Sequence, residues 1–291
     1  LSHATHDGES PIWRHWLQEL SRDHQFIRYD LRGCGLSDRD VEDISFDAWL
    51  SDLEAVANTI DGPVTLLGLS QGCALSIAFA LRHPKKEERL ILIGSYAQGM
   101  LARGDATNAQ LEADTLANLV RLGWGKEVQA FNQVFTHLFV PSGTPEQHSW
   151  WRRLERESAS PEIALRTLEI LHKIDVLADA VKLELPALIF HAIDDARIPF
   201  DEGRKLAAVI AGAQFVALDT ANHILLENEP AWEVFLKTFR AFLPETMTHR
   251  PVRAAYHLTN AEEDVVALVA KGMGNHEIAA VLGKSEKTVR N

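Results

Sequence analysis

Short apolar runs alternate with helix-period segments through the first part of the chain. Three runs have the length and composition of buried β-strands: residues 26–29, 64–69 and 90–93. Two segments between them carry apolar side chains on one helical face: residues 46–60 and 74–81. Strands separated by helices imply crossover connections, so the pattern predicts an α/β fold, a mostly parallel sheet with helices on both faces.

The pattern changes between about residues 97 and 180, where no β-rich run occurs and large apolar side chains recur at helical spacing. This predicts a helical insertion. Its tryptophans Trp124, Trp150 and Trp151 could line a substrate pocket or fill the core of the insertion, and we expect packing for most of them. The sheet then resumes with strands and helices in alternation: strands 187–190 and 215–218, helices 206–210 and 232–242.

A predicted linker divides the chain. Residues 244–257 begin with Pro244, contain a second proline and show no periodicity. From residue 244 to the end there are six Lys/Arg and six Asp/Glu, so the net charge of −12 lies on residues 1–243. An acidic surface repels phosphate, and any contact with nucleic acid is therefore expected from the tail, residues 258–291.

Composition limits the cellular setting. No apolar run approaches the roughly 20 residues that a membrane span needs, and two cysteines, Cys34 and Cys73, cannot form a disulfide framework. We therefore expect a cytoplasmic protein without a membrane partner. His3 and His6 have no further partner at metal-ligand spacing, so neither a metal nor a cofactor is expected. Because the chain starts at Leu1 instead of methionine, we also expect sequence upstream of it.

A G-x-S-x-G motif occupies residues 68–72, where a predicted buried strand meets a predicted helix. A strand that reverses directly into a helix strains the backbone at Ser70, and the flanking glycines let strand and helix approach while the hydroxyl projects from the sheet. The N-terminus of the helix also favours developing negative charge. We interpret Ser70 as a nucleophile rather than as part of a structural turn.

A serine nucleophile needs a base that an acid holds in one tautomer. In a nucleophile-elbow protein these partners follow in the order Ser, Asp, His, each just beyond a strand. His223 follows the strand at 215–218, and Asp194 and Asp195 both follow the strand at 187–190. The order favours a Ser-Asp-His triad, with two neighbouring candidates for its acid.

Two further motifs stand in register with the elbow. Residues 30–37 read D-x-R-G-x-G-x-S, and Asp195 is followed by Pro199 in D-x-x-[VI]-P. With these motifs, residues 1–243 resemble the α/β-hydrolase superfamily. The resemblance implies that Asp195 is the acid and that the helical insertion is a cap over the active site.

The resemblance also implies an oxyanion hole made by backbone N–H groups. The two positions that match are Gln71, directly after the nucleophile, and Thr5, in the segment that stands for the family's His-Gly loop. The chain departs from the family at its start, because it begins inside the family's third strand.

The tail carries signals for three short helices. Thr259 and Glu262 form a capping box at the first helix, and Gly272 ends it. Asn275 is expected to cap the second helix, and Gly283 to end it. A third helix then begins after Ser285, and connections this short are typical of a helix-turn-helix.

The tail, residues 258–291, resembles the LuxR-type helix-turn-helix family through N-x-E-I-A at 275–279 and S-x-K-T-V at 285–289. It departs from the family at Ala261, where an arginine is usual. The chain also stops inside the recognition helix, so we expect an incomplete domain that lacks the helix through which such domains commonly dimerise.

The resemblance implies that the recognition helix enters the major groove of DNA. The side chains expected near DNA are Lys284, Lys287, Thr288 and Arg290. Two hypotheses follow. The first is a transcription regulator, taken as a homodimer, whose hydrolase domain senses or hydrolyses a small ester, thioester or lactone. The alternative is a stand-alone serine esterase with a vestigial tail.

Overall fold

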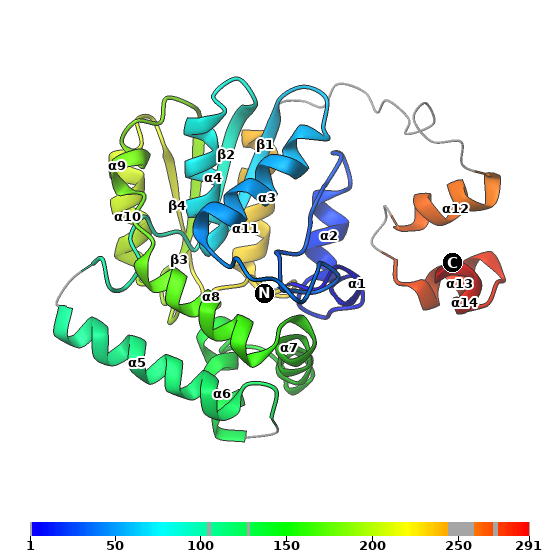
Figure 1. Cartoon of the computed structure of the whole chain (residues 1–291). Helices are drawn as coiled ribbons and strands as arrows, with labels where there is room; N and C mark the ends of the chain where they lie inside the picture. Colours follow the sequence, from blue (N-terminus) through cyan, green and yellow to red (C-terminus); the bar gives the residue numbers. More distant parts are fainter. Residues whose placement is uncertain (1, 104–105, 127–128, 244–258, 270–272, 291) are drawn as a thin grey trace.

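A four-stranded parallel sheet forms the centre of the molecule, with strand order β1-β2-β3-β4 (Figure 1). The computed structural model describes residues 2–103, 106–126, 129–243, 259–269 and 273–290. The strands are β1 (Val64–Leu69), β2 (Glu87–Ile93), β3 (Ala187–Ala192) and β4 (Gln214–Leu218). The predicted α/β class is confirmed.

Helices cover both faces of the sheet because successive strand residues point to opposite sides. Leu90 and Leu92 of β2 pack against α4 and α10, whereas Ile91 and Ile93 pack against α2 and α11. The helices in these layers are α2 (Arg14–Leu20), α3 (Phe46–Asn58), α4 (Gln71–Arg82), α10 (Phe200–Val209) and α11 (Pro230–Phe242). Both faces of the central strands are therefore buried.

The segment after β2 forms a helical layer at one end of the sheet, drawn in green in Figure 1. It consists of α5 (Ala106–Gly123), α6 (Gln129–Phe139), α7 (Pro145–Ser158) and α8 (Pro161–Lys173). Trp124 and Phe135 of this layer share a core with Trp49 and Leu50 of α3. Trp124 and Trp151 are buried in this layer, and Trp150 is half-buried.

The predicted strand at residues 26–29 is wrong, because these residues have no regular structure. A strand needs a neighbour for its backbone N–H and C=O groups, and β1, the nearest edge of the sheet, pairs with β2 alone. The apolar character of the segment has another cause: Tyr29 packs on the α3 core and Phe26 on the α11 core.

Three helices follow the hydrolase-like body: α12 (Asn260–Val269), α13 (Asn275–Leu282) and α14 (Glu286–Arg290). The proposed linker 244–257, together with Leu258 and Gly272, lies outside the described residues. The capping box is confirmed, since the Thr259 backbone N–H donates to Glu262 at 2.7 Å and the Glu262 N–H donates to Thr259 Oγ1 at 3.4 Å.

The start of α13 differs from the prediction. Gly274, not Asn275, is the N-cap residue, and its N–H donates to the Glu277 carboxylate at 3.0 Å. The carboxylate of Glu277, three residues after the cap, thus satisfies the backbone N–H of Gly274. Gly283 ends the helix as predicted, at a left-handed φ of 62°.

The packing of α11 on the sheet leads to a stability prediction. Phe235 is fully buried against Phe190 and Trp232, whereas its neighbour Val234 is 44% exposed. Phe235→Ala should lower the free energy of unfolding by about 3–5 kcal/mol through lost burial and the cavity left behind. Val234→Ala should change it by less than about 1 kcal/mol. Urea unfolding checks both variants, and equal losses would contradict this packing.

Candidate functional site

Ser70 sits in a strained backbone conformation between β1 and α4. Its φ of 53° and ψ of −115° make it the one non-glycine residue with positive φ in the described part of the chain. The strain arises because β1 ends at Leu69 and α4 begins at Gln71, which leaves no loop between them. Such a conformation costs about 1–3 kcal/mol and is typical of functional sites.

Gly68 and Gly72 flank Ser70 but have different roles. A Cβ at Gly68 would lie 2.7 Å from the Gly72 carbonyl oxygen and 2.8 Å from Cys73 Cα, so a side chain there would push the strand and helix apart. A Cβ at Gly72 would meet nothing within 4 Å. Both glycines were expected to let the strand and the helix approach each other. Only Gly68 does so, because a side chain at Gly72 would meet no neighbour.

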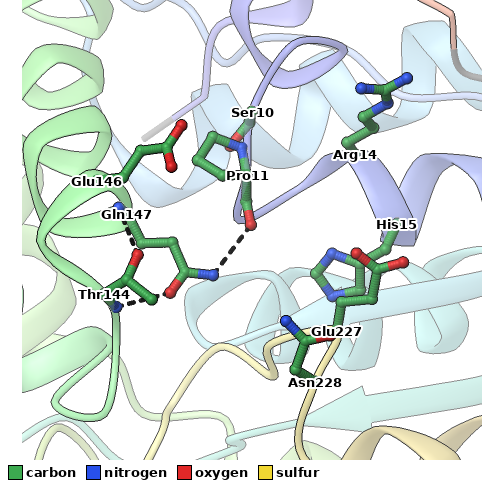
Figure 2. A pocket seen from close by; sticks show the side chains of 9 residues that line it. All are labelled: Ser10, Pro11, Arg14, His15, Thr144, Glu146, Gln147, Glu227 and Asn228. Atoms are coloured by element: carbon green, nitrogen blue, oxygen red, sulfur yellow. Dashed lines mark hydrogen bonds between the residues drawn. The ribbon is translucent and has the colours of Figure 1, made fainter.

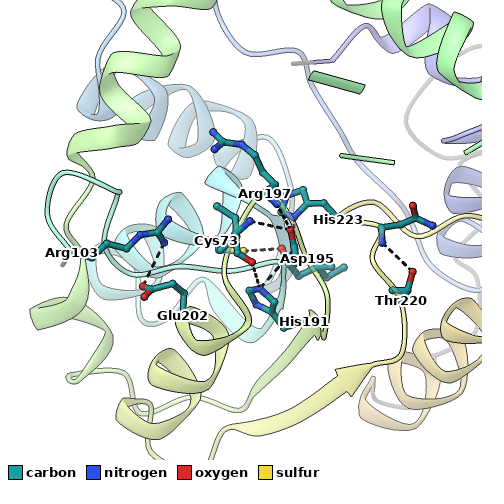
Figure 3. A network of polar contacts seen from close by, with 11 residues as sticks. Cys73, Arg103, His191, Asp195, Arg197, Glu202, Thr220 and His223 are labelled. Atoms are coloured by element: carbon teal, nitrogen blue, oxygen red, sulfur yellow. Dashed lines mark hydrogen bonds and ion pairs between the residues drawn. The ribbon is translucent and has the colours of Figure 1, made fainter. Parts of the chain in front are cut away.

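Asp195 is the acid that contacts His223, at 2.6 Å between Asp195 Oδ2 and His223 Nδ1 (Figure 3). The other oxygen, Oδ1, accepts the backbone N–H groups of Arg197 and Ile198 at 2.8 and 2.9 Å. Burial by itself would raise the pKa of Asp195, but the His223 ring and the donated hydrogen bonds lower it below its ordinary value. Asp194 is exposed.

His223 is 2% exposed and has one ring nitrogen free. Because Nδ1 contacts Asp195, the acid favours the tautomer with hydrogen on Nδ1, and Nε2 is left as an acceptor. Nε2 is buried and has no hydrogen-bond partner among the described residues. The ring lies close to Gly94, where a Cβ would come within 2.5 Å of His223 Cε1. A glycine after β2 thus makes room for the imidazole.

Residues that the sequence analysis missed hold this arrangement in place. The Asn222 side chain accepts from the Ser142 backbone N–H at 3.0 Å and donates to Glu229 at 3.1 Å, which joins the His223 loop to the helical layer and to α11. His191, fully buried, contacts the Ile198 carbonyl at 3.0 Å and lies 3.7 Å from Asp195 Oδ2. In the sequence, Asn222 could be noticed only as the neighbour of His223, and His191 only as a histidine four residues before Asp195.

A cavity of about 760 Å³ brings Ser70, Gln71 and His223 to one surface. The cavity lining as a whole is mostly apolar, and the helical layer contributes four aromatic side chains to it: Trp124, Phe135, Phe139 and Trp151. The Phe139 ring meets the His223 ring edge to face at 5.7 Å. An apolar ligand could therefore lie against the serine and the histidine with little water present.

Thr5, the expected second oxyanion donor, does not line the cavity, whereas Gln71 does. Thr5 lies in the short helix α1 (Ala4–Asp7), is exposed, and is not among the residues that line the cavity. The N–H of its neighbour Ala4 donates to Asp30 at 3.0 Å. The structure thus brings Gln71, but not the Thr5 side chain, to the cavity with Ser70.

A second pocket, of about 300 Å³, is lined by polar residues from the start of α2, the start of α7 and the loop before α11 (Figure 2). Gln147 donates to the Pro11 carbonyl there at 3.2 Å, and burial lowers the pKa of His15 to about 4. Arg14 on its rim pairs with Glu277 of α13. No strained nucleophile faces this pocket, so the chemistry is assigned to the larger cavity.

Within the described residues, no group of three or more His, Cys, Asp or Glu side chains could hold a metal ion. None of the helices described is long and apolar enough to cross a bilayer. Cys73 is a fully buried core residue. Cys34 is also buried, at 3% exposure, although it lies in a loop.

The tail exposes the side chains that the sequence analysis placed near DNA. Lys284, Lys287 and Thr288 are all exposed, and the side chain of Arg290 lies outside the described residues. Ser285 begins α14 by accepting the Thr288 N–H at 3.2 Å. The lysines therefore stand at the beginning of the last helix, where a recognition helix contacts DNA.

Comparison with known families supports both halves of this description. Residues 7–230 match the family described as alpha/beta hydrolase fold. The chain belongs to the α/β hydrolase fold family. Residues 256–291 of this α/β hydrolase match the family of bacterial regulatory proteins of the luxR type, so both resemblances seen in the sequence are confirmed.

Relatives of this α/β hydrolase include named enzymes. The AB hydrolase superfamily protein YisY of Bacillus subtilis (strain 168) is 26% identical over 73% of this chain and 80% of YisY. A pimeloyl-[acyl-carrier protein] methyl ester esterase of Nitrosomonas europaea is 24% identical over 82% of this chain and 91% of the esterase. The enol-lactonase from Burkholderia xenovorans LB400 has a TM-score of 0.65 at 24% identity, over 81% and 85% of the two chains, which shows a common fold.

Glu155, which lines the cavity, leads to a prediction about pH. It is 4% exposed, accepts the Trp151 Nε1–H at 2.8 Å, and burial raises its pKa from about 4.5 to about 8. The folded protein thus binds more protons than the unfolded chain between these pH values, and this carboxyl makes stability fall as pH rises from about 4.5 to 8. Glu155→Gln keeps an acceptor for Trp151 without this proton uptake.

Glu155→Gln should therefore be more stable than the wild type at pH 8, by about 1–3 kcal/mol, and the difference should shrink toward pH 5. Urea unfolding at a series of pH values measures it. Glu146→Gln, an exposed change on the same helix, is the control and should follow the wild-type curve. A constant difference across the pH range would contradict the raised pKa.

Proposed function

We propose that this chain is a LuxR-type transcription regulator whose hydrolase domain binds and hydrolyses a small ester, thioester or lactone. The observation that carries the proposal is the 2.6 Å contact between His223 Nδ1 and Asp195. It leaves Nε2 of His223 as a buried acceptor in the cavity that also exposes the strained Ser70. A nucleophile, a base and an orienting acid are what acyl transfer requires.

In the proposed reaction, Ser70 Oγ attacks the carbonyl carbon while His223 Nε2 accepts its proton. The alcohol, thiol or ring oxygen then leaves with that proton, and an acyl group stays on Ser70. A water molecule then gives a proton to the same nitrogen and attacks the acyl carbon. The acid is released, and the proton on His223 returns to Ser70 Oγ. Asp195 keeps the imidazole in one tautomer and stabilises its charged form.

We assign the oxyanion to backbone N–H groups. Gln71 is the first residue of α4, so its N–H has no partner within the helix and adds to the positive end of the helix dipole. The backbone N–H of Thr5 is the second donor that we propose, on the resemblance of its segment to the family's His-Gly loop; Thr5 itself does not line the cavity. The names of the relatives, an esterase and an enol-lactonase, support an ester or lactone as the substrate class.

Ser70→Ala should lower the rate of 4-nitrophenyl acetate hydrolysis by at least about a thousandfold, because the nucleophile is lost. Asp195→Asn should also reduce the rate strongly by disturbing the His223 tautomer. Asp194→Asn, the exposed neighbour, is the matched control and should stay within about twofold. Steady-state kinetics of the three purified variants decides this. Activity retained by Ser70→Ala, or a greater loss in Asp194→Asn, would contradict the assignment.

The regulator half of the proposal rests on the LuxR-type segment and its exposed lysines. The hydrolase body carries the net negative charge, so DNA contact falls to Lys284, Lys287, Thr288 and Arg290. A homodimer, which we expect, would place two such segments on two half-sites. Access to chromosomal DNA also supports the expected cytoplasmic location.

In the full-length protein, Lys287→Ala should weaken binding to a fluorescein-labelled duplex and reduce the dependence of affinity on salt, because one phosphate contact is lost. Fluorescence anisotropy at two salt concentrations, about fourfold apart, measures both effects. Lys237→Ala, an exposed lysine on α11, is the control and should bind as the wild type does. Salt-insensitive, equal binding of all three chains, or no binding by any, would favour the stand-alone esterase.

A further inference from the structure

Arg197 is a cavity-lining cation that the proposed reaction does not use; Arg28, which also lines the cavity, is paired with Asp7. It follows the acid turn, two residues after Asp195, and lines the cavity together with Ser70 and His223. Its backbone N–H is engaged by Asp195, but its guanidinium has no carboxylate within 4 Å among the described residues. Figure 3 shows the guanidinium extending away from both Asp195 and Glu202.

The acidic groups nearest to Arg197 are already engaged. Asp195 accepts from His223 and from two backbone N–H groups. Glu202 lies 3.6 Å from Arg103 and accepts from Lys205 at 2.8 Å. Neither carboxylate therefore forms an ion pair with Arg197, and the charge of Asp195 acts on the guanidinium only from beyond contact distance.

Arg103, a second cation near Arg197, is paired with Glu202, and the other titratable groups named here are mostly neutral near pH 7. Burial raises the pKa of Tyr96 to about 12, and burial together with Arg197 and Arg103 lowers the pKa of His172 to about 4. Glu155, with its raised pKa, is mostly protonated. Burial also lowers the pKa of Arg197 itself, which is expected of a cation without a counterion. A positive charge in this apolar surrounding favours an anionic ligand.

The Phe139 side chain lies next to both the Arg197 guanidinium and the His223 ring. Its ring lies 5.7 Å from the His223 ring and 5.9 Å from Arg197 Cζ, so the imidazole and the guanidinium lie around one aromatic side chain. A ligand that reaches from Ser70 to Arg197 would pass along Phe139. The apolar lining suits a short carbon chain between a carbonyl at one end and an anion at the other.

We infer that Arg197 binds a carboxylate of the substrate, so that the hydrolysed compound is a small ester or lactone carrying a carboxylate a few bonds from its reactive carbonyl. A guanidinium matches the two oxygens of a carboxylate with parallel N–H donors. A single guanidinium without an ion-pair partner balances the one negative charge of a carboxylate. A dianionic phosphate carries a second negative charge and would call for more donors. This inference rests on the proposed function for its reaction, but the binding step is separable from it.

The test measures binding in the Ser70→Ala chain, where no turnover interferes. The probes are mono-4-nitrophenyl glutarate, which carries the carboxylate, and 4-nitrophenyl hexanoate, which is similar in length and uncharged. Both nitrophenyl esters should quench tryptophan fluorescence on binding, since Trp124 and Trp151 line the cavity. The glutarate ester should bind more tightly than the hexanoate ester.

Adding Arg197→Met should raise the Kd of the glutarate ester about ten- to hundredfold, the range expected for a hydrogen bond to a charged group. The Kd of the hexanoate ester should change by less than about threefold. Arg197→Lys keeps the charge and should retain part of the preference. Arg204→Met, an exposed arginine on α10, removes the same charge outside the cavity and should change neither Kd.

Equal losses for both esters in Arg197→Met would overturn the inference, because they would assign Arg197 to packing on Phe139. The absence of any preference for the glutarate ester would overturn it as well. If the charged ester binds with the predicted preference but the chain with Ser70 intact does not hydrolyse it, the carboxylate site stands and the proposed catalysis fails. The two failures are thus distinguishable.

Discussion

The direct junction between β1 and α4 constrains the whole site. Because no residue separates the strand from the helix except Ser70, this residue takes a φ of 53°, and the junction is fixed by the bond from its N–H to the Ile93 carbonyl at 2.8 Å. Gly68 allows the helix to lie against the strand, and Gly94 at the end of β2 leaves room for His223. Packing of helices on both sheet faces holds these strands, which offsets the strain at Ser70.

The cavity and the outer surface have opposite electrostatic character. The chain carries a net charge of −12, which favours neither phosphate nor carboxylate near the body. Inside the cavity, the Asp195 carboxylate is hydrogen-bonded to His223 and to two backbone N–H groups, Glu155 holds its proton, and Arg197 has no carboxylate in ion-pair contact. An anionic ligand is therefore favoured inside the cavity, because the groups nearby, rather than the net charge of the chain, determine binding there.

Much of this architecture could be predicted from the sequence because it depends on local patterns. The elbow at residues 68–72 and the buried strands before and after it have strong local signals. The strand at 26–29 could not be judged in the same way, since strand pairing depends on a neighbour that the local pattern does not specify. The unpaired state of Arg197 was equally hidden, because it depends on which partners Asp195 and Glu202 find in three dimensions.

The central claim is that Ser70 is a nucleophile activated by His223, and its most direct test is covalent labelling. Incubation with a fluorophosphonate, followed by mass spectrometry of the intact chain and of its peptides, should show one adduct, on the peptide that contains Ser70. Replacing His223 by Gln should slow its formation by at least about a hundredfold, since the base that activates the hydroxyl is lost. An adduct on another residue, or labelling at the same rate without His223, would contradict the account.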